Sequence, residues 1–374
     1  MNTILTIAIV ITLLTSTIIV LRWGHTVCEG SMPSSLFAFC AILFTSGLDV
    51  GLLMFPLTEF PVYEQEAVYQ FANPLAVEFG MWGFLVWAFY FLTTFYFCRI
   101  EPQVKLFEIP VVKFVNNCIV IATCAFTGFL FLSYLPTYIE GISAIAQYGL
   151  VAAVVCCAVI SSTDVKYVKV LSIGSTWLFF ALIAYLWANS GMGAGGFLGS
   201  AANIGEYFTN VHRFVAPLSD YHAFYLFWWF SWSIMIGQFV SRFLSPMKTR
   251  NLLVVLLVIP SIPIGIWFSV LYYYHAYAIE LSETAKFCLI SVGVVFVINS
   301  LDSLIRLYTV NLGITVEKVG RRNYILGNAA AMFTLIILYQ FTPFQIEWVG
   351  LVVIALYSLI YGLLYTRRGA LSQA

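Results

Sequence analysis

The stretch Trp228-Trp229-Phe230-Ser231-Trp232 lies within an apolar run that extends from Phe224 to Val240. A run of this kind without a charged residue is typical of a membrane-spanning helix. Its three indoles fall within about one and a half helical turns, and indole has the strongest cation-attracting face of the aromatic side chains. Tryptophan usually marks the ends of spans, but Trp232 lies near the middle of the predicted span 219–244. We therefore expect these indoles to form one wall of a cation-binding site.

The composition of the whole chain also indicates an integral membrane protein. Of the 374 residues, 61% are hydrophobic and only 9% are charged, which leaves too little polar surface for a water-soluble protein of this size. About 20 apolar residues are needed for a helix to cross the hydrocarbon core of a bilayer. Such spans are predicted over residues 2–22, 34–57, 74–98, 112–134, 141–161, 167–188, 219–244, 251–275, 284–310, 323–341 and 346–366.

The charges in the loops between these eleven spans predict an orientation in the plasma (inner) membrane. Most basic residues, among them Arg99, Lys166 and Arg242, fall at one face, and only Arg213 and Lys286 fall at the other. Because cytoplasmic loops carry the excess of Lys and Arg, we expect the N-terminus outside and the C-terminus in the cytoplasm. The first span lacks a small-residue cleavage pattern and is expected to be retained. The eight cysteines show no metal-type spacing, so neither a disulfide nor a metal ion is predicted from them.

The order of the spans is compatible with two halves of five helices each, residues 34–188 and 219–366. A peripheral helix in 1–24 precedes them, and an outer connecting segment, 189–218, joins them and contains a predicted surface helix over 198–212. An odd number of helices per half inverts the second half relative to the first. Inverted repeats place the substrate near the middle of the membrane, beside a helix that Gly or Pro interrupts.

The first helix of the first half is the best candidate for such an interruption. Gly47, Asp49 and Gly51 lie in its core and Pro56 follows. An acid at mid-span costs about 2.5–3.5 kcal/mol on insertion scales, so Asp49 is expected to be functional. The two glycines would let a ligand or a neighbouring backbone approach closely, and they also satisfy a common helix-packing pattern.

A second aromatic set, Trp82, Trp87 and Tyr90, recurs at helical spacing in the third span. Alone it would be read as ordinary helix packing, but opposite the first set it could complete a box around a quaternary ammonium group. Glu78, near the start of the same span, is interpreted as a solvated acid at the helix entrance. Glu59 is assigned to an outer loop.

Polar residues inside two further spans admit more than one interpretation. Asp302 and Arg306 are four residues apart, which favours an ion pair within one helix. Asn299 and Ser300 nearby, and Thr123 with Thr127, offer oxygen ligands for Na+. Hydroxyl groups in membrane helices more often bond the preceding turn.

At these residues the chain resembles the betaine/choline/carnitine transporter family, secondary carriers with the five-plus-five inverted-repeat fold also seen in the leucine transporter. The family's Trp-Trp-x-Ser-Trp signature and its continuation are matched by Trp228, Trp229, Ser231, Trp232, Gly237, Phe239 and Arg242. Its Trp-Gly-x-x-x-Trp-x-x-Tyr motif is matched by Trp82, Gly83, Trp87 and Tyr90. The family's glycine stretch, followed by Met-Phe and a Glu, is matched from Gly47 to Glu59. The likeness covers about residues 20 to 310.

The resemblance implies an aromatic substrate box and sodium sites. The box would be formed by Trp228, Trp229, Trp232, Trp82, Trp87 and Tyr90. One sodium site would map onto Thr45, Leu48, Phe296, Asn299 and Ser300, and another onto Thr123 and Thr127. The resemblance also makes a homotrimer possible, with a monomer as the alternative.

Asp49 is the departure from the family pattern that matters most, because it replaces the middle glycine of the family's glycine stretch. A fixed anion beside the box favours a net cation over a zwitterion, although the same acid might instead bind Na+ or carry a proton. Arg306 adds a positive charge near Asn299, and a fixed cation can replace Na+. Leu85 stands where the family often has His, and the family usually has twelve spans.

These observations predict an all-α membrane protein with a leucine-transporter-like core and one extra N-terminal helix. We expect a secondary transporter of a small quaternary-ammonium or amine solute, driven by Na+, with no other cofactor and no nucleic-acid partner. The alternative is a sodium-independent or proton-coupled carrier or exchanger of a zwitterionic compatible solute. A transport-fold sensor or an intramembrane enzyme is less favoured, because no nucleophile and base pair stands out in the sequence.

Overall fold

Ten helices in the computed structural model, which describes residues 1–48 and 50–366, are long and apolar enough to cross a membrane. Several are single helices, whereas others are built from short segments that follow one another. The single helices are α1 (Asn2–Trp23), α8 (Pro110–Tyr138), α9 (Ala144–Ser161), α10 (Lys166–Asn189), α16 (Glu283–Leu312), α18 (Arg321–Phe341) and α19 (Ile346–Thr366). The segmented spans are α5 (Pro74–Trp82) with η2 (Phe84–Val86), α6 (Trp87–Phe95), η3 (Tyr96–Ile100) and α7 (Glu101–Val104); α13 (Asp220–Val240) with η6 (Ser241–Phe243); and α14 (Thr249–Val258) with α15 (Ser261–Ala276).

The predicted span 34–57 is not one continuous helix. α2 (Leu36–Gly47) starts at Ser35, whose hydroxyl accepts a hydrogen bond from the Ala38 N–H, and it ends in the middle of the span. Leu48 is extended, with φ −127° and ψ 147°. Two short helices follow, α3 (Val50–Met54) and α4 (Pro56–Gln65). The structure therefore places the interruption directly after Gly47, and Gly51 lies within α3.

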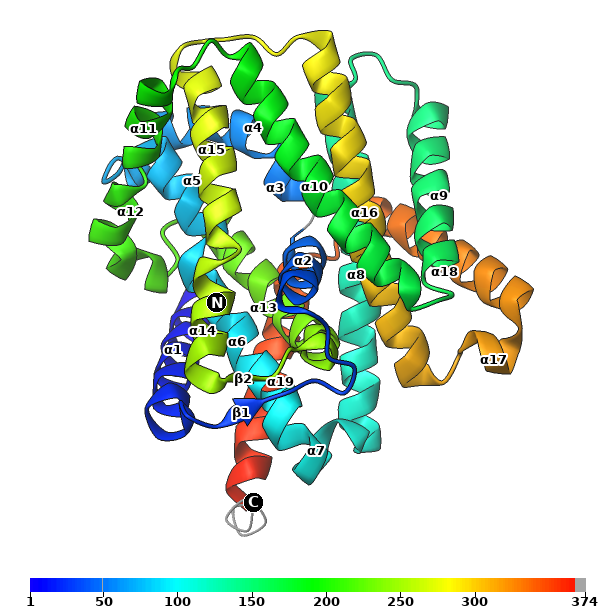
Figure 1. Ribbon diagram of the computed structural model, residues 1–374. Coiled ribbons are helices and arrows are strands. Elements are labelled where there is room, and N and C mark those ends of the chain that lie inside the picture. Colours follow the sequence, from blue (N-terminus) through cyan, green and yellow to red (C-terminus); the bar gives the residue numbers. More distant parts are fainter. Residues whose placement is uncertain (49, 367–374) are drawn as a thin grey trace.

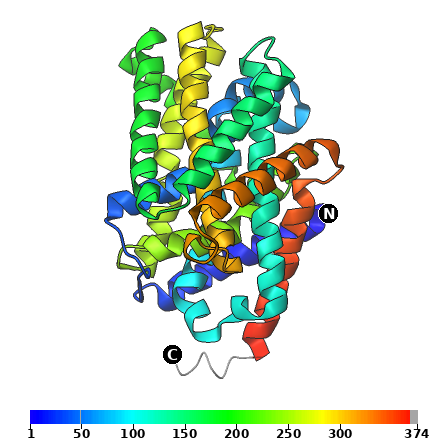
Figure 2. The same cartoon turned by 90° about the vertical axis from the view of Figure 1, so that its right-hand side faces the viewer.

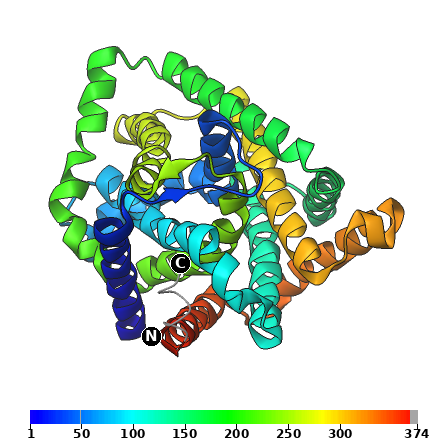
Figure 3. The ribbon, with the colours of Figure 1, turned by 60° about the horizontal axis from the view of Figure 1, so that its bottom comes forward.

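α13 lies near the centre of the bundle and packs against α6, α19 and α2. Figure 1 shows α11 and α12 on one side of the molecule and α9, α17 (Val316–Val319) and α18 on the other. In Figure 2, α8 and α19 run side by side, and the two helices are also in contact. Figure 3 shows α1 at the periphery, where it packs against α6 and α14. Residues from the whole bundle thus form one apolar core.

The connecting segment differs from the prediction in detail. Instead of one surface helix over 198–212, it contains α11 (Ala194–Ala202), α12 (Gly205–Asn210) and the short η5 (Val211–Val215). A turn at Asn203 and Ile204 separates the first two. The Asn203 amide donates to the Gly199 carbonyl, and such local side-chain bonds compete with helix continuation.

A short antiparallel ribbon, which the sequence did not predict, joins two loops at one end of the bundle. β1 (Val27–Cys28) pairs with β2 (Met247–Lys248). Beyond it, the N–H groups of Gly30 and Met32 donate to the carbonyls of Leu244 (3.0 Å) and Arg242 (2.7 Å). A Cβ on Gly30 would lie 2.4 Å from the Arg242 oxygen, so only glycine fits. The chain that leads into α2 is therefore bound to the end of α13.

Candidate functional site

The interruption in the first core helix lies against aromatic rings from other helices. The Gly47 carbonyl, at the end of α2, accepts a hydrogen bond from the Tyr90 hydroxyl at 3.2 Å. A Cβ placed on Gly51 would lie 2.6 Å from a ring carbon of Trp82 and 3.0 Å from one of Trp228. Residues from α5, α6 and α13 therefore meet at the same short stretch of backbone.

Five of the six predicted box residues form one cluster, which we call the aromatic cluster: Trp82, Trp87, Tyr90, Trp228 and Trp229. All five are buried. The Trp82 ring stands edge-on to Trp228 and Trp229, with centroid distances of 5.4 and 5.5 Å. Tyr90 lies 5.2 Å from Trp87 and 5.8 Å from Trp229. Two distant segments of the sequence are thus brought together as the helical spacing predicts.

Main-chain hydrogen bonds hold two of these rings. The Trp229 indole donates to the Met81 carbonyl at 2.8 Å, and the Trp87 indole donates to the Trp82 carbonyl at 3.1 Å. The indole N–H of Trp82 is buried, interacts with the Glu78 carboxyl group and makes no hydrogen bond of ordinary geometry among the described residues. Buried donors of this kind are rare and call for an explanation.

Trp232, the sixth predicted box residue, is placed differently. Its side chain is 2% exposed and its indole N–H also has no partner in the part of the chain that the structure describes. The ring contacts that connect the aromatic cluster do not include it. Trp232 lies one helical turn beyond Trp228, so it borders the cluster along α13 without closing it.

The aromatic cluster is closed in this conformation. Its edge-to-face pairs place the rim of one ring on the face of the next. A cation bound by aromatic rings needs their faces within about 6 Å of its charge, so the rings must reorient before a quaternary ammonium group can enter.

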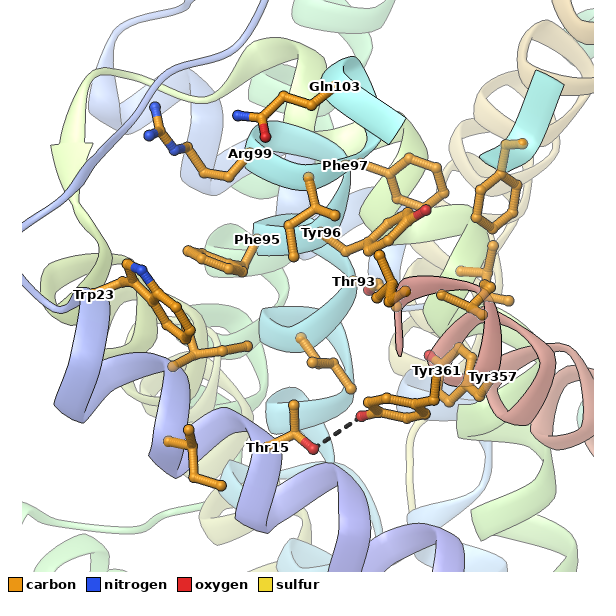
Figure 4. A pocket seen from close by; sticks show the side chains of 18 of the residues that line it. Thr15, Trp23, Thr93, Phe95, Tyr96, Phe97, Arg99, Gln103, Tyr357 and Tyr361 are labelled. Atoms are coloured by element: carbon orange, nitrogen blue, oxygen red, sulfur yellow. Dashed lines mark hydrogen bonds between the residues drawn. The ribbon is translucent and has the colours of Figure 1, made fainter. Parts of the chain in front are cut away.

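A separate cavity of about 480 Å³ lies between α1, α6, η3 and α19. Figure 4 shows Arg99 and Gln103 at one end of it and the hydrogen bond between Tyr361 and Thr15 at the other. That bond joins α19 to α1 at 2.9 Å. Residues of the aromatic cluster do not line this cavity. Asp49, the predicted counter-ion, lies outside the described residues.

The first predicted sodium site gathers groups from the end of α2 and from α16. The Ser300 hydroxyl donates to the Leu48 carbonyl at 3.0 Å, across the interruption. Asn299 is oriented by α10, because its amide donates to the Ser175 hydroxyl at 2.7 Å. The Thr45 hydroxyl bonds the preceding turn, at the Ala41 carbonyl. Phe296 lies on the same helix as Asn299 and packs its ring on Phe44.

The second predicted pair, Thr123 and Thr127, lies in the interior of α8 and is fully buried. Thr127 donates to the Thr123 carbonyl at 3.1 Å, as hydroxyls in membrane helices commonly do. The Thr123 hydroxyl is buried without a partner among residues 1–48 and 50–366. One unsatisfied oxygen is thus left at this position.

The predicted ion pair between Asp302 and Arg306 is confirmed, with a distance of 2.9 Å and both side chains buried. The Arg306 guanidinium also donates to the carbonyls of Ser161 (3.0 Å) and Asp164 (3.1 Å). It is therefore directed to the end of α9, where helix carbonyls favour a positive charge.

Two acids are placed differently from the prediction. Glu59, assigned to an outer loop, is 3% exposed, and Glu78, interpreted as a solvated entrance acid, is fully buried. The reason is that α4 continues the interrupted helix into the protein and packs on α5 and α15. Tyr221 and Tyr225 on α13 both donate to Glu59, and the spacing of these tyrosines at i and i+4 was the signal in the sequence.

Comparison with known proteins supports the fold. No protein-family model matches this chain. The chain is 28% identical over 281 residues to an uncharacterized transporter from Haemophilus influenzae. The alignment covers 63% of this chain and 42% of that protein. The chain thus spans less than half the length of this relative.

Among solved structures, the chain is similar to a Na+-coupled sialic acid symporter in a substrate-bound, outward-open state, with a TM-score of 0.53 and 12% identity. The alignment covers 95% of this chain and 85% of the symporter. The chain is therefore an all-α, multi-pass membrane protein, and the predicted leucine-transporter-like fold is confirmed.

Proposed function

We propose that the protein is a secondary transporter of a small onium or amine solute, of the betaine/choline/carnitine kind, that works by alternating access. The observation that carries this proposal is the convergence of α5, α6 and α13 on the interrupted helix, with Trp82 and Trp228 against Gly51. Interrupted helices at the centre of such folds are where transporters hold their substrates. The fold of a symporter and the similarity to a transporter agree with this assignment.

The aromatic cluster suits a positively charged guest without hydrogen-bond donors. Rings of Trp and Tyr attract a quaternary ammonium through their faces, and each desolvated contact contributes up to about 2 kcal/mol. Trp232 would extend the site along α13, where its indole N–H is available to an oxygen of the solute. Asp49 remains the proposed counter-ion.

Na+ is the proposed coupling ion. The Leu48 carbonyl and the Ser300 hydroxyl already face each other at 3.0 Å, and a sodium ion would be bound by both oxygens together with Thr45, Asn299 and Phe296. Thr123 and Thr127 supply the second proposed position. The Arg306 guanidinium is paired with Asp302 and bound to a carbonyl at the end of α9. These contacts favour Na+ over the Arg306 charge as the cation at the first position.

Uptake into proteoliposomes tests the proposal. Choline, betaine, carnitine, ectoine, proline, simple amines and sialic acid are offered with an inward Na+ gradient and with K+ in its place. We expect an onium or amine solute to accumulate only with Na+. Equal uptake in K+ would favour the sodium-independent or proton-coupled carrier, and accumulation of sialic acid alone would contradict the assignment of substrate class.

Paired tryptophan variants test the site itself. Trp229→Leu removes a ring that contacts Trp82 and Tyr90, and we expect uptake to fall at least tenfold. Trp177→Leu is the matched control, because Trp177 is 58% exposed on α10. Similar uptake by the two variants, at equal amounts in the membrane, would remove the aromatic cluster from the proposal.

A further inference from the structure

Glu59 and Glu78, which we call the acid pair, lie next to the aromatic cluster inside a cage of tyrosines. The Glu59 carboxylate accepts hydrogen bonds from Tyr63 at 3.0 Å, from Tyr225 at 2.7 Å and from Tyr221. These donors satisfy both of its oxygens. Hydroxyl donors from two helices, α4 and α13, therefore converge on the Glu59 carboxyl group.

Glu78 is in the opposite situation. It is fully buried, and neither carboxyl oxygen makes a hydrogen bond of ordinary geometry within the described residues. Glu59, Tyr63 and the Trp82 indole are the groups that interact with it. The Trp82 N–H is also buried and makes no other hydrogen bond of ordinary geometry within the described residues, so Glu78 is the polar group it interacts with. Two buried carboxyl groups side by side are costly to ionise together, so we expect the pair to share one proton.

The groups around the acid pair supply no compensating positive charge. They are the hydroxyls of Tyr63 on α4, Tyr69 in η1 (Ala67–Tyr69), Tyr134 and Tyr138 on α8, and Tyr221 and Tyr225 on α13. On α15, Tyr272 and His275 pack against Phe60, and the His275 ring pairs with the half-exposed Glu64 at 3.0 Å. Among residues 1–48 and 50–366, no lysine or arginine forms an ion pair with either acid.

The acid pair and the aromatic cluster share Trp82. Trp82 follows Glu78 by one helical turn on α5, and its ring lies 5.4 Å from Tyr225, which bonds Glu59. A cation held against the Trp82 face would therefore lie close to the acid pair. Its charge would stabilise the ionised form of both acids, whereas a proton neutralises one of them in its absence.

We propose that the acid pair is a proton site that releases one proton when a cationic solute binds at the aromatic cluster. This inference rests on the proposed function. It adds that the bound cation replaces a proton when the solute binds. The proton moves from the carboxyl group of Glu78 to water as the cation enters, so the net charge of the region is unchanged.

Calorimetric binding of choline and tetramethylammonium to the purified protein, from about pH 5 to about pH 9, tests the inference. Each titration is repeated in two buffers of different ionisation enthalpy, which counts the protons released. For the wild type, we expect one proton released per cation and a Kd that falls about tenfold per pH unit where the pair titrates. Glu78→Gln should bind without proton release and without this pH dependence.

Glu66→Gln is the matched control, because Glu66 is exposed just beyond α4, and it should behave as the wild type. Retention of proton release in Glu78→Gln would overturn the inference.

Tyr63→Phe keeps the inference testable if Glu78→Gln does not fold. Removal of one donor to the Glu59 carboxyl group should move the pH range of release upward, and an unchanged range would contradict the proposal. Binding of a cation by the wild type without proton release would overturn the inference and leave the proposed function standing. Binding of neither probe would overturn the assignment of solute.

Discussion

Gly51→Ala tests directly whether the interrupted helix lies against the aromatic cluster. The added methyl would lie 2.6 and 2.9 Å from two ring carbons of Trp82 and 3.0 Å from one of Trp228. Carbon atoms normally contact at about 3.5–4.0 Å, so the Trp82 ring must retreat by about 1 Å. Trp229 and Tyr225 already hold that ring at centroid distances of 5.5 and 5.4 Å. Overpacking of this kind costs about 1–3 kcal/mol.

Gly327→Ala is the reference for this change, because Gly327 lies in α18 with no atom within 4 Å of an added Cβ. Alanine favours a helix by about 1 kcal/mol over glycine at either position, so that contribution cancels in the comparison. We expect the free energy of unfolding in one detergent to be about 1–3 kcal/mol lower for Gly51→Ala than for Gly327→Ala. Equal stability of the two variants would refute the close approach of α3 to the rings.

Three further outcomes follow from contacts elsewhere in the bundle. Arg306→Gln leaves Asp302 buried without its partner and should lower the free energy of unfolding by about 3–5 kcal/mol, whereas the double variant with Asp302→Asn should recover most of it; additive losses would contradict the pairing. Ser300→Ala should reduce the rise in melting temperature that Na+ produces relative to K+, and a full rise would exclude this hydroxyl from the sodium site. Hydrogen bonds from the Lys166 backbone N–H and then its side chain lower the pKa of Asp164, so the stability they contribute is present above the ordinary pKa of Asp and is lost as pH falls through the lowered one. Lys166→Met keeps the backbone donor and should raise the pKa of Asp164 only part of the way in a carboxyl NMR titration; no change would contradict the role of the side chain.

The aromatic pattern, together with the family resemblance, indicated which helices could meet. Trp82, Trp87 and Tyr90 recur at helical spacing, as do the indoles of α13, and each set has one crowded face. Helical spacing predicted that each set shares one face, and the structure places the two sets in contact. The position of Trp232 could not be predicted, because helical spacing shows on which face of α13 a residue lies. It does not show which side chains of neighbouring helices lie at the same height along the helix axis.

The acid pair shows what sequence reasoning could not supply. Glu78 lies in the second turn of its span, where acids are usually solvated, and it is buried because α4, α13 and α15 pack on α5. That packing depends on the chain turning inward after Leu48, a tertiary feature that hydropathy does not encode. The absence of ordinary hydrogen bonds at the Glu78 oxygens, among the described residues, is visible only once these helices are placed.

The ribbon formed by β1 and β2 limits how the molecule can move. Several main-chain hydrogen bonds tie the approach to α2 to the exit from α13, and each contributes about 0.5–1.5 kcal/mol net. We therefore expect these two helices to move together at that end. Glu59 on α4 accepts hydrogen bonds from Tyr221 and Tyr225 on α13, which belongs to the fastened end. A displacement of α4 relative to α13 would therefore break these two hydrogen bonds.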